Sequence, residues 1–171
     1  MDRLCTDKLG RALALRLLQP EDGPLFADFY ASLSDRDAYY FYPHPLDDEH
    51  AYKLAARAEQ RGHITLLATG EAQGGDVLAG YAYITEHGDG GPWWFGICVR
   101  PEYQEARVGT ALLGRLLELA REHGVRRIFL HVHKDNPRGQ RLYRRYGFEI
   151  VGESVNEQQN VPQYHMELAL Q

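Results

Sequence analysis

The apolar residues of this chain follow two spacings, one typical of strands and the other typical of helices. Leu13, Leu15 and Leu17 alternate with other side chains, as the buried face of a strand does. Val108–His123 instead repeats apolar residues at helical spacing, and Gly124 follows it. In chain order the pattern predicts strand Leu13–Leu18, helices Leu25–Leu33 and Asp47–Arg61, strands His63–Thr69, Val77–Thr85 and Trp93–Val99, helix Val108–His123, strand Arg127–His133, helix Pro137–Tyr146, and strands Phe148–Glu153 and Tyr164–Leu170.

The order of these elements predicts an α/β fold. Trp93–Val99 is apolar throughout, as a strand buried on both faces would be. A long helix separates it from the strand Arg127–His133, and this spacing fits one right-handed parallel crossover. The short Gly-rich breaks elsewhere are typical of hairpin loops rather than of linkers. We therefore expect a single domain over residues 1–171, with a mixed, mostly antiparallel sheet and helices on both faces.

Composition excludes several classes of protein. The 171 residues are enough for one domain with its own core, and 44% of them are apolar. No apolar run approaches the roughly 18 residues of a membrane span, and six charged residues interrupt the first 19 positions. Two cysteines, Cys5 and Cys98, are too few for a disulfide framework. We therefore expect a cytoplasmic protein that acts without a membrane.

The charge is unevenly distributed along the chain. The net charge of −5 argues against a general nucleic-acid binder. Residues 1–99 carry eight basic and fifteen acidic side chains, whereas residues 100–149 carry eleven basic and six acidic ones. Residues 150–171 carry three acidic side chains and no basic one. A basic stretch inside an acidic chain is either a solvated helix surface or an anion-binding site.

The basic stretch contains a turn from a strand into a helix. Pro101–Tyr103 leaves the strand that ends at Val99, and Gln104–Thr110 opens the long helix. Such a turn presents unpaired backbone N–H groups at the positive end of a helix dipole, which suits a phosphate group. No Gly-Lys-Ser/Thr sequence follows, so this is not a Walker loop.

A second short motif follows at residues 136–148. Asn136 precedes a helix that contains Leu142 and Tyr143, and Gly147-Phe148 comes after it. Together the two motifs resemble those of the GNAT superfamily of acyl-CoA-dependent N-acyltransferases, and the order of elements resembles that of the family over nearly the whole chain. The residues that carry the resemblance are Val99, Pro101, Tyr103, Gln104, Gly109, Thr110, Asn136, Leu142, Tyr143, Gly147 and Phe148.

The resemblance implies acetyl-CoA as cosubstrate and a set of residues that bind it. The strand around Ile97–Val99 would diverge from Ile128–His133, and the pantetheine arm would lie in the gap. A backbone N–H of Ile97–Val99 would polarise the thioester carbonyl, and Tyr143 would protonate the leaving thiolate as the general acid. The implied cofactor-binding residues are Ile97, Cys98, Val99, Gln104, Glu105, Ala106, Arg107, Val108, Gly109, Thr110, Asn136, Arg138 and Tyr143.

Arg107 departs from the family pattern, which has glycine at this place. At a positive φ a residue other than glycine costs about 1–2 kcal/mol. At a negative φ the arginine is tolerated, and its guanidinium would add a contact to the phosphates. Because Gln104, Gly109 and Thr110 are all present, we expect cofactor binding to be retained.

The general base is expected on the strand that follows the long helix. His131 lies five residues before Asn136, where some members of the family place an acid, and imidazole suits base chemistry near neutral pH. His133 shares its face and is the next candidate, while Glu86 and His87 would act through water. The alternatives for the two histidines are hydrogen-bonded positions in the sheet, or a metal pair that lacks an evident third ligand.

The acceptor would be bound by the first part of the chain. In the family the first two helices and their connection form the acceptor wall, and here that connection holds four consecutive aromatic residues at 39–42. Aromatic side chains receive an amine by cation–π contact, but they equally pack helices together. We expect Tyr39, Tyr42 and Trp94 to contact the substrate.

The sequence therefore favours an N-acetyltransferase that transfers the acetyl group of acetyl-CoA directly to a primary amine of a small molecule or a protein. Residues 1–92 would form the acceptor side of the domain and residues 93–150 its cofactor side. A non-catalytic CoA-binding or regulatory module of the same fold is the alternative, and a metalloenzyme built on His131 and His133 is a more distant one. The resemblance is compatible with a homodimer, and we expect no bound metal, nucleic acid or membrane. The basic residues expected to face the cofactor are Arg107, Lys134, Arg138, Arg141, Arg144 and Arg145.

Overall fold

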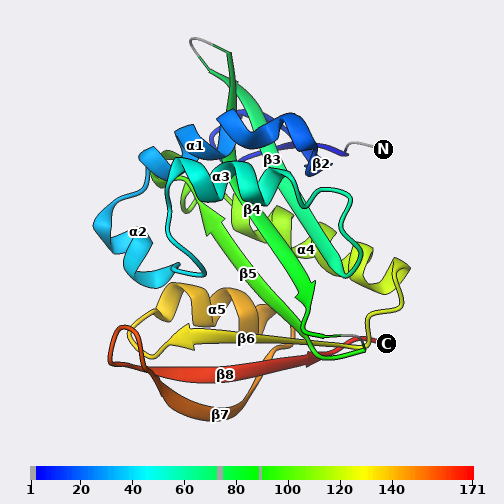
Figure 1. Cartoon of the computed structure of the whole chain (residues 1–171), viewed down its shortest axis with the longest axis vertical. Helices are drawn as coiled ribbons and strands as arrows, with labels where there is room; N and C mark the ends of the chain where they lie inside the picture. Colours follow the sequence, from blue (N-terminus) through cyan, green and yellow to red (C-terminus); the bar gives the residue numbers. More distant parts are fainter. Residues whose placement is uncertain (1–2, 73–74, 89) are drawn as a thin grey trace.

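The residues that the computed structural model describes, 3–72, 75–88 and 90–171, form one sheet of eight strands with helices packed on it (Figure 1). The strands are β1 (Arg3–Thr6), β2 (Ala12–Leu17), β3 (His63–Ala72), β4 (Gly75–Glu86), β5 (Trp93–Val99), β6 (Arg127–His133), β7 (Glu149–Asn156) and β8 (Val161–Ala169). The helices are α1 (Gly23–Ala31), α2 (Asp35–Tyr40), α3 (Asp48–Ala55), α4 (Val108–Glu122) and α5 (Pro137–Arg145), with 3-10 turns at Pro20–Asp22 and Pro101–Tyr103.

The strand order confirms the predicted fold class. Across the sheet the strands follow the order β1-β2-β3-β4-β5-β6-β8-β7. β5 and β6 run parallel, and the other neighbouring pairs of the described sheet run antiparallel. The parallel pair is joined through α4, as the spacing of the two predicted strands requires.

Two short elements, β1 and α2, have no counterpart in the sequence prediction. β1 has four residues at the edge of the sheet, where Leu4 is 82% exposed, so alternating burial does not mark it. α2 has six residues, none of them buried, and it begins with a capping box between Ser34 and Asp37. A local hydrogen-bond motif, not an apolar face, thus starts this helix.

The helix predicted over residues 47–61 is shorter in the structure. α3 ends at Ala55, and the chain then tightens into turns in which Arg57 donates to Leu54 and Gln60 donates to Arg57, three residues back. The Arg57 side chain also reaches Thr85 on β4. The turns and this contact to the sheet replace the last part of the predicted helix, and the sequence pattern does not show them.

Helices cover both faces of the sheet, and each face has its own apolar core. α1 and α3 cover one face, where Phe26, Phe29 and Tyr81 are buried together. α4 and α5 contribute to the core of the other face, which includes Leu112 and Tyr143. Figure 1 shows α1 and α3 lying side by side in front of the strands and α4 behind them.

α4 is the longest helix of the described chain, with 15 residues. The positions that the helical spacing assigns to its apolar face are all buried, which confirms the pattern. These positions are Val108, Leu112, Leu116, Leu119 and Ala120. Within the described ranges, no helix is long and apolar enough to cross a membrane.

β5 and β6 separate soon after they meet. Their register pairs Trp93 with Ile128 and Trp94 with Phe129, and the described strands share no pair beyond these. Figure 1 shows the two strands diverging toward α2 and α5. β6 stays paired with β8 as far as His133, so the gap opens on the β5 side of β6. The divergence places one backbone edge of β5 beside the start of α4.

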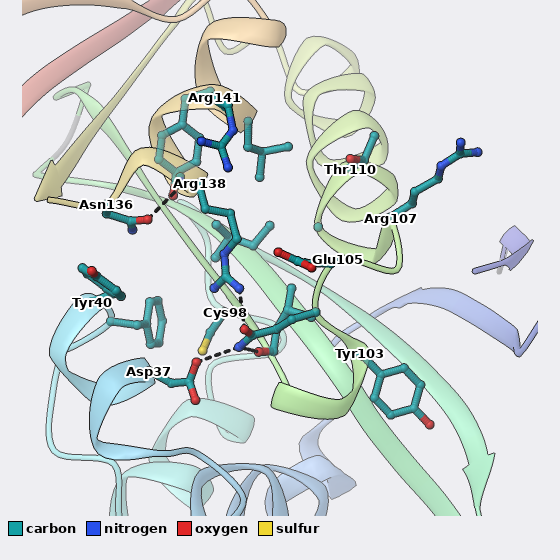
Figure 2. Close-up of a pocket in the computed structure, with 18 of the residues that line it drawn as sticks. Asp37, Tyr40, Cys98, Tyr103, Glu105, Arg107, Thr110, Asn136, Arg138 and Arg141 are labelled. Carbon is teal, nitrogen blue, oxygen red and sulfur yellow. Dashed lines mark hydrogen bonds between the residues drawn. The ribbon is translucent and has the colours of Figure 1, made fainter. Parts of the chain in front are cut away.

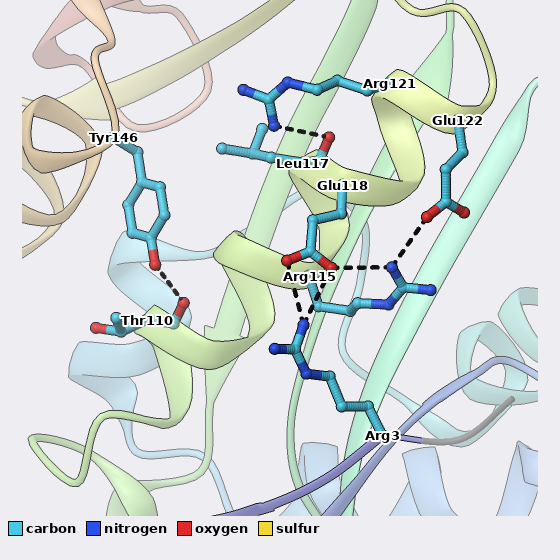
Figure 3. A network of polar contacts seen from close by, with 8 residues as sticks. All are labelled: Arg3, Thr110, Arg115, Leu117, Glu118, Arg121, Glu122 and Tyr146. Carbon is cyan, nitrogen blue, oxygen red and sulfur yellow. Dashed lines mark hydrogen bonds and ion pairs between the residues drawn. The ribbon is translucent and has the colours of Figure 1, made fainter.

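Contacts from β1 and from the end of α5 converge on α4. Arg3 on β1 pairs with Glu118 at 3.1 Å, and Glu118 also pairs with Arg115 at 2.9 Å. At the other end of the helix, the Tyr146 hydroxyl donates to the Thr110 carbonyl at 2.7 Å (Figure 3). Exposed ion pairs add little stability each, but together these contacts hold β1 and the end of α5 against the same helix.

Leu116→Ala is expected to lower the free energy of unfolding by about 2–5 kcal/mol, because this side chain is fully buried between α4 and the sheet. Arg121→Ala, at an exposed position of the same helix, is the control and should change that free energy by less than about 0.5 kcal/mol. Equal losses in the two variants, measured by denaturant unfolding, would contradict the packing of α4.

Candidate functional site

A cavity of about 530 Å³ opens at the gap between β5 and β6, bounded by the start of α4, by α5 and by the end of α2 (Figure 2). Most of the predicted cofactor residues line it, namely Ile97, Cys98, Val99, Gln104, Glu105, Arg107, Gly109, Thr110, Asn136, Arg138 and Tyr143. Ala106 and Val108 are buried and do not line it. Six further lining residues are not among the predicted cofactor residues, and of these the sequence motifs name only Tyr103 and Leu142. The six are Asp37, Tyr40, Phe41, Tyr103, Gly139 and Leu142.

The backbone of β5 forms the inner wall of the cavity. The N–H of Arg100 donates to a carbonyl of β4 at 2.9 Å. Because the polar groups of successive strand residues point to opposite sides, those of Cys98 also face β4, whereas those of Ile97 and Val99 face the gap. On that side the Val99 carbonyl accepts from the Gln104 side chain at 3.0 Å. Of the three predicted residues, Cys98 therefore contributes its side chain and the other two contribute backbone N–H groups.

The loop before α4 forms a second wall. Glu105 and Arg107 both adopt left-handed backbone conformations, with φ values of 57° and 70°. The helical hydrogen bonds begin with the N–H of Ala111, which donates to the Arg107 carbonyl at 3.0 Å. The N–H groups just before it lack a helical partner, and they lie at the positive end of the helix dipole. Such a turn is suited to an anion.

Arg107 has a positive φ, which is a strained backbone conformation for a residue other than glycine. The arginine stands where the family pattern has glycine, and its conformation costs about 1–2 kcal/mol. The alternative of a tolerated, negative φ is thereby excluded. The side chain is exposed and extends away from Asn136 and Arg138 in Figure 2. The loop thus keeps its shape despite local strain.

Gln104 connects three sides of the cavity. Its Nε2 group donates to the Asp37 carboxylate at 2.6 Å and to the Val99 carbonyl, and its Oε1 atom accepts from Arg138 (Figure 2). Burial acts to raise the pKa of Asp37, but hydrogen bonds from Ser34 and Gln104 outweigh it and lower the pKa below its ordinary value. The charged carboxylate therefore ties α2 to the loop before α4 and, through Gln104, to α5.

α5 places Asn136 and Tyr143 on the cavity wall. The Asn136 side chain accepts from the Gly139 N–H at 3.0 Å and caps the helix. The Tyr143 ring packs edge-on against Phe95, with the ring centres 5.8 Å apart. Burial raises the pKa of the Tyr143 hydroxyl above its ordinary value, so the group keeps its proton at neutral pH. A protonated phenol on the wall is able to act as an acid.

His131 projects from β6 on the same side of the sheet as Trp94, and it does not line the cavity. Its ring stacks on His165 with the centres 4.3 Å apart, and the Trp94 ring lies edge-on to it at 4.7 Å. Partial burial, together with the neighbouring His165, lowers the pKa of His131 below its ordinary value. The ring is therefore neutral at neutral pH and able to accept a proton.

His133 has different surroundings from His131. It is 7% exposed, and the rings of Tyr39 and Tyr40 pack against it at 4.8 Å and 5.9 Å. Its Nδ1 atom has no hydrogen-bond partner among the described residues. Among residues 3–72, 75–88 and 90–171, no group of three or more His, Cys, Asp or Glu side chains is arranged to hold a metal ion.

None of the three residues predicted to contact the substrate lines the cavity. The hydroxyls of Tyr39 and Tyr40 donate to the side chain and the carbonyl of Asp135, at 3.1 Å and 3.0 Å. Tyr42 is 50% exposed. Trp94 lies at the narrow end of the gap, where β5 and β6 still pair. The aromatic segment thus fastens α2 to the loop after β6.

Basic side chains outnumber acidic ones around the cavity. Arg107, Arg138, Arg141 and Arg145 line it, against Asp37 and Glu105. The expectation that Lys134 and Arg144 face the same cavity is wrong, since neither lines it. Lys134 instead pairs with Glu153 at 2.5 Å. The three arginines of α5 that line the cavity follow helical spacing, so the sequence contains a signal for them. No residue near Asp37 in the chain indicates that Asp37 lines the cavity.

Comparison with known proteins finds partial relatives. The N-alpha-acetyltransferase RimI of Mycobacterium tuberculosis is 40% identical over 84 residues, which are 47% of this chain and 51% of that protein. The chain therefore spans about half or less of the length of the curated relatives it matches.

Solved structures share the fold over most of both chains. The ribosomal-protein-S5-alanine acetyltransferase from Vibrio fischeri has a TM-score of 0.78 at 11% identity, covering 92% of each chain. The spermidine N-acetyltransferase from Vibrio cholerae, in complex with CoA and spermine, has a TM-score of 0.73 at 20% identity, covering 92% of this chain and 95% of that one. At these identities the likeness establishes the fold.

The family itself is shown by a match to a family model. The model of the acetyltransferase (GNAT) family matches residues 27–148. This range begins within α1 and ends at Phe148, so it includes the diverging strands, the loop before α4 and the three helices that border the cavity. The resemblance carried by the two sequence motifs is therefore confirmed, and this chain belongs to the GNAT acetyltransferase family.

Proposed function

We propose that this chain is an N-acetyltransferase that moves the acetyl group of acetyl-CoA to a primary amine. The observation that carries the proposal is the divergence of β5 from β6 after Trp94. It turns the N–H groups of Ile97 and Val99 toward a cavity that also holds the start of α4. The chain thus offers hydrogen-bond donors for an extended arm and a place for phosphates within one cavity.

The residues around the cavity fit acetyl-CoA. A Cβ atom at Gly109 would come within 3.6–3.8 Å of Leu142, Val99 and Ile97, so the glycine leaves open the space beside the free edge of β5. The phosphates would lie against the backbone of residues 105–110, and the arginines of α5 would balance their charge. Asn136 and Cys98 would border the arm. The bound cosubstrate supplies the activated thioester.

Groups of this chain would stabilise the charge that forms during the transfer and would donate and accept the protons. An N–H of Ile97 or Val99 would stabilise the negative charge that forms on the carbonyl oxygen when the amine attacks. Tyr143, kept protonated by burial, would give its proton to the sulfur of the departing thiolate. We assign the base to His131, which is neutral and lies beside Trp94 on the acceptor side of the gap.

We propose that residues 1–92 receive the acceptor and that residues 93–150 hold the cosubstrate. The first 99 residues carry fifteen acidic and eight basic side chains, which suits a cationic amine. One relative is by its name an N-alpha-acetyltransferase, and one structural neighbour is a spermidine N-acetyltransferase. Peptide N-termini and polyamines are therefore the first acceptors to test.

The protein is expected to release CoA thiol from acetyl-CoA when it is given peptides with free N-termini, polyamines, amino sugars or aminoglycosides. Tyr143→Phe keeps the ring and removes the proton donor, and it should lower kcat about 10²–10⁴-fold with little change in CoA affinity. Tyr146→Phe, which removes a hydroxyl that bonds the Thr110 carbonyl, is the control and should keep kcat. CoA binding without turnover of any amine would favour the non-catalytic module, and the absence of CoA binding would contradict both functions.

The pH dependence of kcat tests His131. Because its pKa lies below the ordinary value of about 6.5, the neutral form predominates above that pH, and kcat should be flat there and fall only at lower pH. His131→Ala should lower kcat and abolish this acid limb. His165→Asn removes the neighbour that helps to lower the pKa, so it should move the limb to higher pH. A profile that His131→Ala leaves unchanged would assign the base to another residue.

The affinity for CoA is expected to fall as salt is raised from about 50 to 500 mM, because salt screens the attraction between arginines and phosphates. Arg141→Gln and Arg145→Gln, in the cavity, should reduce this slope when binding is measured by calorimetry. Arg144→Gln, on the same helix but outside the cavity, is the control. An affinity that does not change with salt would contradict the role of the basic rim.

A further inference from the structure

The loop before α4 rests on the turn between β1 and β2. The Lys8 N–H donates to the Ala106 carbonyl at 3.0 Å. At the end of the turn, the Nη1 group of Arg11 donates to the Glu102 carbonyl at 3.0 Å. The Arg11 guanidinium also lies 3.7 Å from the centre of the Tyr103 ring, a cation–π contact. One short turn therefore contacts the loop at residues 102, 103 and 106.

Asp7 holds this turn in shape. Its carboxylate accepts from the N–H groups of Leu9 and Arg11 at 2.8 Å and 3.0 Å, and from Arg11 Nε at 2.6 Å. Asp7 is 8% exposed. The Nη2 group of Arg11 is buried without a hydrogen-bond partner in the described structure. The guanidinium thus sits where Asp7 and the Tyr103 ring place it, although that position leaves one donor unpaired.

The loop that receives these contacts is the strained one. Ala106, whose carbonyl accepts from Lys8, lies between Glu105 and Arg107, the two residues with left-handed φ values. Strained backbone persists only where the surrounding structure holds it. Tyr103 borders the cavity, and its ring points away from Arg138 in Figure 2. The turn between β1 and β2 therefore supports the loop from behind, at its strained centre.

We propose that the turn formed by residues 7–11 is a clamp that keeps the loop before α4 in its anion-binding shape, and that Arg11 is a positioning residue for the phosphates of the cosubstrate. Arg11 does not line the cavity, so it acts through the loop. Without the clamp the loop relaxes, and binding has to restore the strained conformation, which weakens affinity. The identity of the ligand rests on the proposed function, whereas the stabilisation of the loop by the turn does not require a ligand.

The test compares Arg11→Met with Arg16→Met. Arg11→Met keeps an apolar stem and removes the side-chain contacts to Asp7, Glu102 and Tyr103. Arg16 lies on β2 and pairs with a buried aspartate, Asp22, at 2.6 Å, as Arg11 pairs with the buried Asp7, so Arg16→Met is a matched control for lost stability. The measurements are the dissociation constant of CoA by calorimetry, the KM for acetyl-CoA, kcat, thermal unfolding, and hydrogen exchange of the amides at residues 105–110.

Arg11→Met is expected to raise the dissociation constant of CoA and the KM for acetyl-CoA about 5–30-fold, the factor that corresponds to the strain of one left-handed residue. Exchange of the loop amides should become faster, and kcat at saturating acetyl-CoA should stay within about twofold. Arg16→Met should lower the unfolding temperature and leave loop exchange and CoA affinity unchanged. Arg11→Lys keeps a charge beside Asp7 but lacks the planar fork, so it should fold and still weaken binding.

Arg107→Gly separates the clamp from a general loss of order. Glycine adopts φ of 70° without strain, so Arg11→Met should cost little affinity in the Arg107→Gly background. An equal cost in both backgrounds would overturn the clamp, and so would unchanged loop exchange in Arg11→Met. If the unmodified chain does not bind CoA, the proposed function fails and the assignment of Arg11 to phosphates fails with it. Loop exchange would then still decide whether the turn holds the loop.

Discussion

The site of this protein depends on the point at which β5 and β6 stop pairing. A strand that leaves its neighbour exposes backbone N–H and C=O groups that must find other partners. Here the Val99 carbonyl is satisfied by Gln104, while the N–H groups of Ile97 and Val99 remain directed into the gap. Behind this edge the Tyr83 ring lies where a Cβ at Gly96 would be, so β5 is packed tightly on its acceptor face. The free edge is thus held rigidly in place.

Gln104 and the loop around it connect this free edge to the rest of the molecule. Its side chain bonds Asp37 on α2, and it accepts from Arg138 on α5, so residues far apart in the chain meet at one amide. Next to it the loop adopts two left-handed conformations that would be costly for a free peptide. The contacts from the turn between β1 and β2 offset that cost from the opposite side. Contacts with residues distant in the chain therefore stabilise the locally strained loop.

The uneven charge of the sequence corresponds only in part to the site. Three arginines of α5 line the cavity, as their place within the second motif indicates. Other basic residues of the same stretch form surface pairs instead, among them Arg115 with Glu118 and Lys134 with Glu153. A count of charges in a segment cannot separate these two groups, because neighbouring residues of a helix or a loop point in different directions.

The sequence by itself determined the fold class, the longer strands and helices, the two motifs and the position of Tyr143, because these follow from periodic burial and from local turn chemistry. It did not determine β1, α2, the early end of α3, or the partners Asp37 and Arg11. β1 and α2 have no buried residue that periodic burial could mark, and the two partners depend on contacts with residues distant in the chain, Asp37 with Gln104 and Arg11 with Tyr103. The left-handed φ of Arg107 belongs to the same group, since the tertiary structure alone holds a strained conformation that local preference disfavours.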